Sequence, residues 1–296
     1  MNSAKRGFIF FCVLAVSATL VISSSAATIR DDAPDSAYLA LGAQSDFSAV
    51  GSLVAGSFYN GSGILIAPNW VLTAAHLLLF SSTATFSISG TTYSSSAVYH
   101  DPAWNGYGTN GGDFGLVKLS TPVTNIMPAT LYTGGTELGL LGTYVGFGAT
   151  GTGVTGYHLP PDGNRRAFQN TIDTSFNNSA QVFGSLFINP HDPAAGTPQP
   201  LEGCVAPGDS GGGAFVQVGT QFELAGVISF VGYTNGTGNS IYGNVTGASS
   251  IPAGLPWMSS IIPDLVPEPT TIALVTTGLA LGAVCLRKKR FGSMRH

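Results

Sequence analysis

The sequence predicts an all-β protein, and three observations support this fold class. Glycine accounts for 40 of the 296 residues, roughly twice its usual share of about 7%, and glycine favours tight turns. Only 9% of the residues are charged while 44% are hydrophobic, which excludes a charge-rich disordered chain and a coiled coil. Short β-like runs alternate with turn residues, and no long helical period occurs between the two ends of the chain.

The clearest strands lie in the first half of the chain. Residues 63–67 and 70–73 flank a Pro68-Asn69 turn and predict a hairpin. Residues 114–119 are mostly apolar and end before Thr121-Pro122, which predicts a buried strand. Further strands are expected over residues 49–57, 83–88 and 92–99.

The second half is less regular. Residues 214–218 and 221–230 flank a Gly219-Thr220 turn and predict a second hairpin. A strand is also expected over 144–147, loops over 148–156 and 192–200, a solvated turn at Arg165-Arg166, and a short helix over 256–262. A boundary between two β units is expected near residues 125–142.

The N-terminus has the order of a secretory signal peptide. Two basic residues precede an uncharged run over 8–22, and small residues follow over 23–27. This pattern predicts a signal peptide over 1–27 that signal peptidase removes after Ala26 or Ala27. The alternative is a membrane anchor, but the run is shorter than the roughly 20 residues that a membrane-spanning helix needs.

The C-terminus combines Pro267-Glu268-Pro269, an uncharged run over 270–286 and four basic residues over 287–290. Over residues 266–296 this order resembles the PEP-CTERM sorting signal of bacterial exported proteins. The resemblance implies a transmembrane helix that holds the chain transiently in the inner membrane until an exosortase-type enzyme removes the tail. The alternative is a plain C-terminal tail anchor. Either way, we expect an exported protein, secreted or associated with the cell envelope, that contacts membrane only through its terminal segments.

Charge and cysteine usage limit the possible partners and crosslinks. The net charge is −4, and no patch of Lys and Arg occurs outside the two ends, so a nucleic-acid partner is not expected. Cys12 lies in the signal peptide and Cys285 in the C-terminal apolar run, which leaves Cys204 alone between them. No disulfide can therefore form within residues 28–265, and this part of the chain must rely on its hydrophobic core.

Metal and cofactor signatures are absent from the sequence. His100, His158 and His191 do not have the spacing of metal ligands, and there is neither a His-Glu-x-x-His motif nor a pair of closely spaced cysteines. We therefore expect no metal ion and no cofactor.

Three segments carry the residue types of acyl-transfer chemistry, in the order His, Asp, Ser. They are Thr73-Ala74-Ala75-His76, Asp113 with the following strand, and Gly208-Asp209-Ser210-Gly211-Gly212. A serine hydroxyl needs a base, an imidazole can take its proton near neutral pH, and a carboxylate orients the imidazole. The backbone N–H groups of Gly208 and Ser210 are candidate donors to a developing oxyanion.

These segments resemble those of the trypsin/chymotrypsin-like serine proteases, over about residues 51–262. The resemblance implies that His76 is the general base, Asp113 its orienting carboxylate and Ser210 the nucleophile, with Gly208 and Ser210 forming the oxyanion hole. It also implies two antiparallel β-barrels, over about 38–135 and 136–262 within a domain of residues 28–265, with the active site in the cleft between them.

The sequence departs from the family pattern at several positions. Leu77 stands where most members carry a paired cysteine, and Gly213 replaces a usual proline. Asp209 is the residue that pairs with a new N-terminal ammonium in the family, but no Ile/Val-Val-Gly-Gly start is present. Asp209 is therefore expected either to serve that activation or to hold a local hydrogen bond.

The resemblance also identifies candidate residues of the substrate pocket. Family members that cut after Lys or Arg carry an Asp six residues before the nucleophile, where this chain has Cys204. Ser229, Phe230 and Val231 match the strand that lines the substrate cleft, and Val231 stands where glycine is common. A neutral pocket narrowed by Val231 favours small or medium apolar side chains.

The sequence therefore predicts an exported serine endopeptidase that hydrolyses peptide bonds of protein or peptide substrates through an acyl-enzyme. The alternative is a catalytically inactive module of the same fold that binds a peptide or a surface polymer at the cell envelope. A structural cell-surface protein is a third possibility, but such a protein has no need for the His, Asp and Ser segments together.

Overall fold

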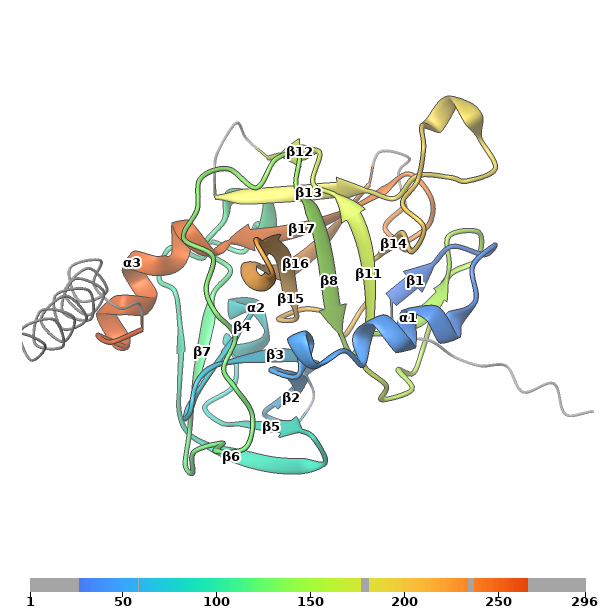
Figure 1. The fold of residues 1–296 in the computed structure, drawn as a ribbon. Coiled ribbons are helices and arrows are strands. Elements are labelled where there is room, and N and C mark those ends of the chain that lie inside the picture. The colour runs from blue at the N-terminus through green and yellow to red at the C-terminus, as the bar shows by residue number, and fades with distance from the viewer. Residues whose placement is uncertain (1–26, 58, 177–180, 234–236, 266–296) are drawn as a thin grey trace, which may run out of the picture.

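The structure is a computed structural model that describes residues 27–57, 59–176, 181–233 and 237–265 (Figure 1). The predicted signal peptide up to residue 26 and the predicted sorting signal over 266–296 lie outside these residues. Among the described helices, none is long and apolar enough to span a membrane.

The first half of the chain forms a closed antiparallel barrel (Figure 1). Its strands follow the order β2-β3-β4-β7-β6-β5. Their bounds are β2 (Val50–Ala55), β3 (Tyr59–Ala67), β4 (Trp70–Thr73), β5 (Ala84–Ile88), β6 (Thr91–His100) and β7 (Gly115–Leu119). The predicted hairpin is confirmed as β3 and β4, in which Ile64 pairs with Leu72.

The second half forms a seven-stranded antiparallel sheet in the order β11-β8-β15-β16-β17-β13-β12. The strands are β8 (Leu141–Gly146), β11 (Arg166–Thr171), β12 (Thr174–Ser175), β13 (Val182–Leu186), β15 (Gly213–Val218), β16 (Gln221–Tyr233) and β17 (Asn244–Ser250). The all-β fold with two β units is thus confirmed. Over the described residues, however, the strand ladder of this second unit does not close into a ring as that of the first does.

A smaller sheet lies beside the second unit, in the order β10-β9-β1-β14. It consists of β1 (Ala27–Ile29), β9 (Thr150–Thr152), β10 (Gly156–His158) and β14 (Gly203–Cys204). Strand β1 runs parallel to β9 and antiparallel to β14. The loop expected over 148–156 is therefore wrong in part, because β9 is too short to leave a sequence pattern and its partner β1 is remote in the sequence.

Three α-helices accompany the sheets in the described chain: α1 (Asp35–Gly42), α2 (Ala75–Leu78) and α3 (Ile251–Ile261). Single 3-10 turns lie at Ser45–Phe47, Gly108–Asn110 and Pro193–Ala195. The predicted C-terminal helix exists as α3 but begins earlier than expected, directly after Ser250 and with a proline in its first turn. Helix α1 was not predicted.

Aromatic packing joins the two β units. Phe47, which precedes β2, is fully buried, and its ring centroid lies 5.2 Å from that of Phe215 and 5.0 Å from that of Phe222. Phe215 and Phe222 belong to β15 and β16 of the second unit. The apolar core of the barrel therefore continues into the second sheet.

A pair of arginines forms a second link, and the solvated turn expected at Arg165-Arg166 is wrong. The guanidinium of Arg166 is buried and lies 2.8 Å from Asp35 of α1 and 2.9 Å from Asp162. Arg165 donates to the carbonyls of Gly42 (2.7 Å) and Val50 (3.1 Å). The start of β11 is thereby tied to α1 and to the first strand of the barrel.

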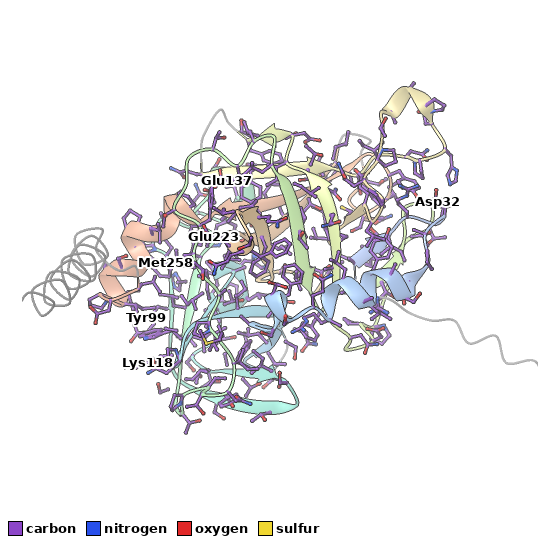
Figure 2. The ribbon with its side chains drawn as sticks, in the orientation of Figure 1. Asp32, Tyr99, Lys118, Glu137, Glu223 and Met258 are labelled. Atoms are coloured by element: carbon purple, nitrogen blue, oxygen red, sulfur yellow. The ribbon has the colours of Figure 1, made fainter. Side chains whose placement is uncertain are left out.

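We predict that Arg166→Ala destabilises the fold by about 3–5 kcal/mol, because it leaves the carboxylates of Asp35 and Asp162 without their buried cation. Lys118→Ala, which also removes one positive charge, is the matched control. Lys118 is labelled in Figure 2 and is exposed, and its ammonium lies 5.5 Å from the centroid of the Trp70 ring, so we expect a cost of at most about 1 kcal/mol. Urea unfolding measures both values. Equal losses would contradict a structural role for the buried ion pairs.

Candidate active site

The end of β4 and the start of β7 bring His76 and Asp113 together. Strand β4 ends at Thr73, and α2 then carries His76 in its single turn. The His76 backbone N–H donates to Oδ1 of Asp113 at 2.9 Å, and Nδ1 lies 2.8 Å from Oδ2. Two contacts to one carboxylate fix the position of the imidazole ring and leave Nε2 on its opposite side.

Asp113 is completely buried and has a third partner on the second β unit. The hydroxyl of Ser229, on β16, donates to Oδ2 of Asp113. A buried carboxylate needs such donors because it has lost its hydration. Ser229 was predicted only as a pocket residue, and no sequence signal indicated this contact.

Trp104 also restricts His76. The centroid of its indole ring lies 6.3 Å from that of the imidazole, and the His76 side chain keeps 30% of its surface exposed. The histidine is therefore packed on one side and accessible on another, as a proton carrier must be.

Ser210 lies in the loop between β14 and β15, on the second unit. Gly208 and Gly211 flank it with φ angles of +101° and +80°, which glycine adopts at little cost. The Ser210 carbonyl accepts a hydrogen bond of 2.8 Å from the N–H of Ser62 on β3. Within the described residues no hydrogen bond joins the Ser210 hydroxyl to His76, a bond that often tightens only when substrate binds.

The predicted oxyanion donors are available. In the described part of the chain the N–H groups of Gly208 and Ser210 have no protein acceptor. The side chain of Asp209 turns inward, where its carboxylate accepts from the N–H groups of Gly148 (2.8 Å) and Ala206 (2.9 Å). The bond to Ala206 lies within the loop itself, whereas the bond to Gly148 joins the loop to the turn after β8. Burial raises the pKa of Asp209 to about 7.

A cavity of about 270 Å³ opens next to Ser210. Its walls are formed by Val205, Ala206, Pro207, Ser210, Ile228, Ser229, Phe230, Val231 and Gly238. Three of the four predicted pocket residues, at 229–231, lie in this wall. The lining is neutral throughout.

Cys204, the fourth predicted pocket residue, is not part of the cavity wall. Its side chain is fully buried behind the wall, where the hydroxyl of Thr246 contacts Sγ at 3.7 Å. Burial raises the pKa of the thiol to about 12, so it is uncharged at neutral pH.

Strand β16 presents a free edge beside the cavity. Its residues 230–233 pair with β17 on one side, from Phe230 opposite Gly247 to Tyr233 opposite Asn244. On the other side, pairing with β15 ends at Val227, and no described strand continues it. An extended peptide can add to such an edge through main-chain hydrogen bonds.

A model of the trypsin family, described as Trypsin, matches residues 43–251. The chain belongs to the trypsin family. It is also 30% identical over 230 residues to chymotrypsin-like elastase family member 1 of Rattus norvegicus, and the match covers 71% of this chain and 82% of that protein. The three motif segments lie inside the range that the family model matches. Among the described residues, no three His, Cys, Asp or Glu side chains form a group that could hold a metal ion.

A further buried carboxyl of this trypsin-family domain lies just before β14. Glu202 is only 2% exposed. Its carboxylate oxygens accept hydrogen bonds from the N–H groups of Ile188 (3.2 Å) and Gln199 (2.8 Å). Burial raises the pKa of Glu202 from 4.5 to about 7.

This shift predicts a pH dependence of stability. Because the pKa is higher in the folded state, Glu202 contributes stability that is complete below pH 4.5 and is lost as the pH rises through 7. We expect Glu202→Gln to remove this loss, on the order of 3 kcal/mol between those limits. Urea unfolding at several pH values compares the two proteins. Parallel stability curves for wild type and Glu202→Gln would contradict the assignment.

Proposed function

We propose that this chain is a serine endopeptidase that uses His76, Asp113 and Ser210 to hydrolyse peptide bonds. The observation that carries the proposal is the double contact of His76 with the buried carboxylate of Asp113, beside a loop with two unoccupied N–H donors. An imidazole held in this way suits proton transfer from a neighbouring serine. Membership of the trypsin family supports the same reaction class.

The proposed reaction proceeds in two halves. The Ser210 Oγ attacks the substrate carbonyl carbon while its proton moves to Nε2 of His76, and Asp113 stabilises the imidazolium. The carbonyl oxygen becomes negative and accepts hydrogen bonds from the N–H groups of Gly208 and Ser210. His76 returns its proton to the leaving amine as the C–N bond breaks. Water then repeats the sequence on the ester and releases the acid and free Ser210.

The pocket supports a preference for small or medium apolar side chains before the cleaved bond. The cavity is neutral, and Ile228, Phe230 and Val231 supply apolar surface to its wall. Val231 projects a branched side chain from a strand that also offers its free edge to the substrate backbone.

We also propose export, with removal of the N-terminal segment by signal peptidase and of the C-terminal PEP-CTERM-like segment by an exosortase-type enzyme. The order of charged, apolar and small residues at the two ends supports this route. Cleavage after Ala26 is favoured over cleavage after Ala27, because Ala27 is buried in β1 and pairs with Thr150.

We predict that a fluorophosphonate probe labels the folded full chain and that Ser210→Ala abolishes labelling. His76→Ala should slow it by more than about 10³-fold, because the serine loses its base. Ser260→Ala, an exposed serine of α3, is the control and should label like wild type.

No labelling of the folded wild-type chain would leave two explanations, and limited proteolysis before labelling separates them. Labelling gained after proteolysis indicates an inactive precursor. Labelling that stays absent favours the alternative function, an inactive module that binds a peptide or surface polymer.

We further predict that a panel of peptide substrates is cleaved after Ala, Val or Leu rather than after Lys or Arg. Val231→Gly should raise kcat/KM for Phe relative to Ala at this position by about 10-fold or more, because it removes the isopropyl side chain from the pocket wall. Preferred cleavage after Lys or Arg by the wild-type protein would overturn the pocket assignment.

A further inference from the structure

Ser62 occupies a central position that no sequence motif indicates. It lies on β3 of the barrel and is fully buried. Its hydroxyl donates to the carbonyl of Gly208 and accepts from the N–H of Phe147, both at 2.9 Å. Its backbone N–H donates to the Ser210 carbonyl at 2.8 Å, and its own carbonyl accepts from the Thr73 hydroxyl at 2.8 Å. One residue of the barrel thus holds two points of the loop that carries Ser210.

The turn after β8 supports the same loop from the other side. Three successive N–H groups of this turn are used: Phe147 donates to the Ser62 hydroxyl, Gly148 to the Asp209 carboxylate, and Ala149 to the Pro207 carbonyl at 2.7 Å. Of these three contacts, only the one through Ser62 involves the barrel.

These contacts determine where the Gly208 N–H points. In a planar trans peptide the C=O and N–H point in opposite directions, so the Pro207 carbonyl bound to Ala149 directs the Gly208 N–H away from Ala149. On the other side of Gly208, Ser62 holds the Gly208 carbonyl. Gly208 has a φ of +101° and no side chain to restrict rotation. Its conformation is therefore fixed by the hydrogen bonds on its two flanking peptides.

We propose that Ser62 is a positioning residue of the oxyanion hole. Its hydroxyl holds the Gly208 carbonyl so that the Gly208 N–H points into the site before substrate binds. A preorganised donor stabilises the oxyanion without reorganisation during the reaction. This inference rests on the proposed serine endopeptidase function, and Ser62 itself does not touch the reacting atoms.

The hydroxyl of Ser62 is not replaceable by an apolar group of similar size. It serves as donor to Gly208 and as acceptor from Phe147 at once. Ser62→Ala leaves both of these backbone groups without their partner. The peptide that follows Gly208 is then held only through its N–H, which Asp209 donates to the Ala206 carbonyl at 3.0 Å. Ser62→Thr retains the hydroxyl.

The test measures kcat and KM of the full chain and its variants, together with their inhibition by a peptide aldehyde. The aldehyde forms a hemiacetal with the serine, and the hemiacetal oxygen occupies the oxyanion hole. We expect Ser62→Ala to lower kcat/KM and aldehyde affinity in parallel, by about 10- to 100-fold. Removing an oxyanion donor costs about 10²- to 10³-fold, and a donor that is only less well oriented should cost less. KM should change by less than about threefold, and Ser62→Thr should recover most of the loss.

Ser185→Ala is the matched control. Ser185 is a buried serine of β13 whose hydroxyl is hydrogen-bonded to that of Tyr144 in β8 at 2.6 Å, and neither residue belongs to the oxyanion loop. It should lower thermal stability without changing aldehyde affinity. An Ser62→Ala protein that binds the aldehyde like wild type, or a loss shared equally by Ser185→Ala, would overturn the inference.

Failure of the proposed function is distinguishable from failure of this inference. A wild-type chain that neither turns over substrate nor binds the aldehyde counts against the endopeptidase. The role of Ser62 is then judged by the NMR order parameter of the Gly208 N–H. A lower value in Ser62→Ala than in wild type and Ser185→Ala supports positioning, and equal values overturn it.

Discussion

The carboxylate of Asp113 is the group on which the arrangement of the two β units depends. It has no exposed surface, and its three donors come from His76 in α2 and from Ser229 in β16. A buried anion that loses such donors is strongly destabilising. The hydroxyl of Ser229 can reach Asp113 only if the second sheet stands correctly against the barrel. The carboxylate that orients His76 therefore also joins the barrel to the second sheet.

Polar contacts and packing stabilise this fold, whereas many small secreted domains are stabilised by disulfides. Cys204 is the free cysteine of the described chain. Leu77, at the position of a paired cysteine in most members of the family, is buried, and a Cβ at Gly61 would lie 2.4 Å from its Cδ1. The leucine thus fills space that Gly61 leaves open. Between the units, Ser62 and the Arg165 guanidinium add hydrogen bonds.

The elements and site residues that the sequence predicted are those whose signal lies within a few neighbouring residues. The hairpins and the candidate residues His76, Asp113 and Ser210 lie in short segments whose residue types are constrained within a few positions. Strand β1 and Ser62 gave no such signal, because their roles come from partners far along the chain. The burial of Arg166 was missed for the same reason, since its partner Asp35 lies in a helix that was itself not predicted. The position of Cys204 depends on a side-chain direction that spacing does not determine.

Strand β1 has a consequence for the order of assembly. It is an interior strand of its sheet, bounded by β9 on one side and β14 on the other, and the Thr28 hydroxyl reaches the Cys204 carbonyl across 176 residues of sequence. Ribosomes add about 5–20 residues per second, so these partners are synthesised on the order of ten seconds apart. Contacts of such long sequence separation also form slowly. The first strand of the folded domain to be made is thus among the last to be placed.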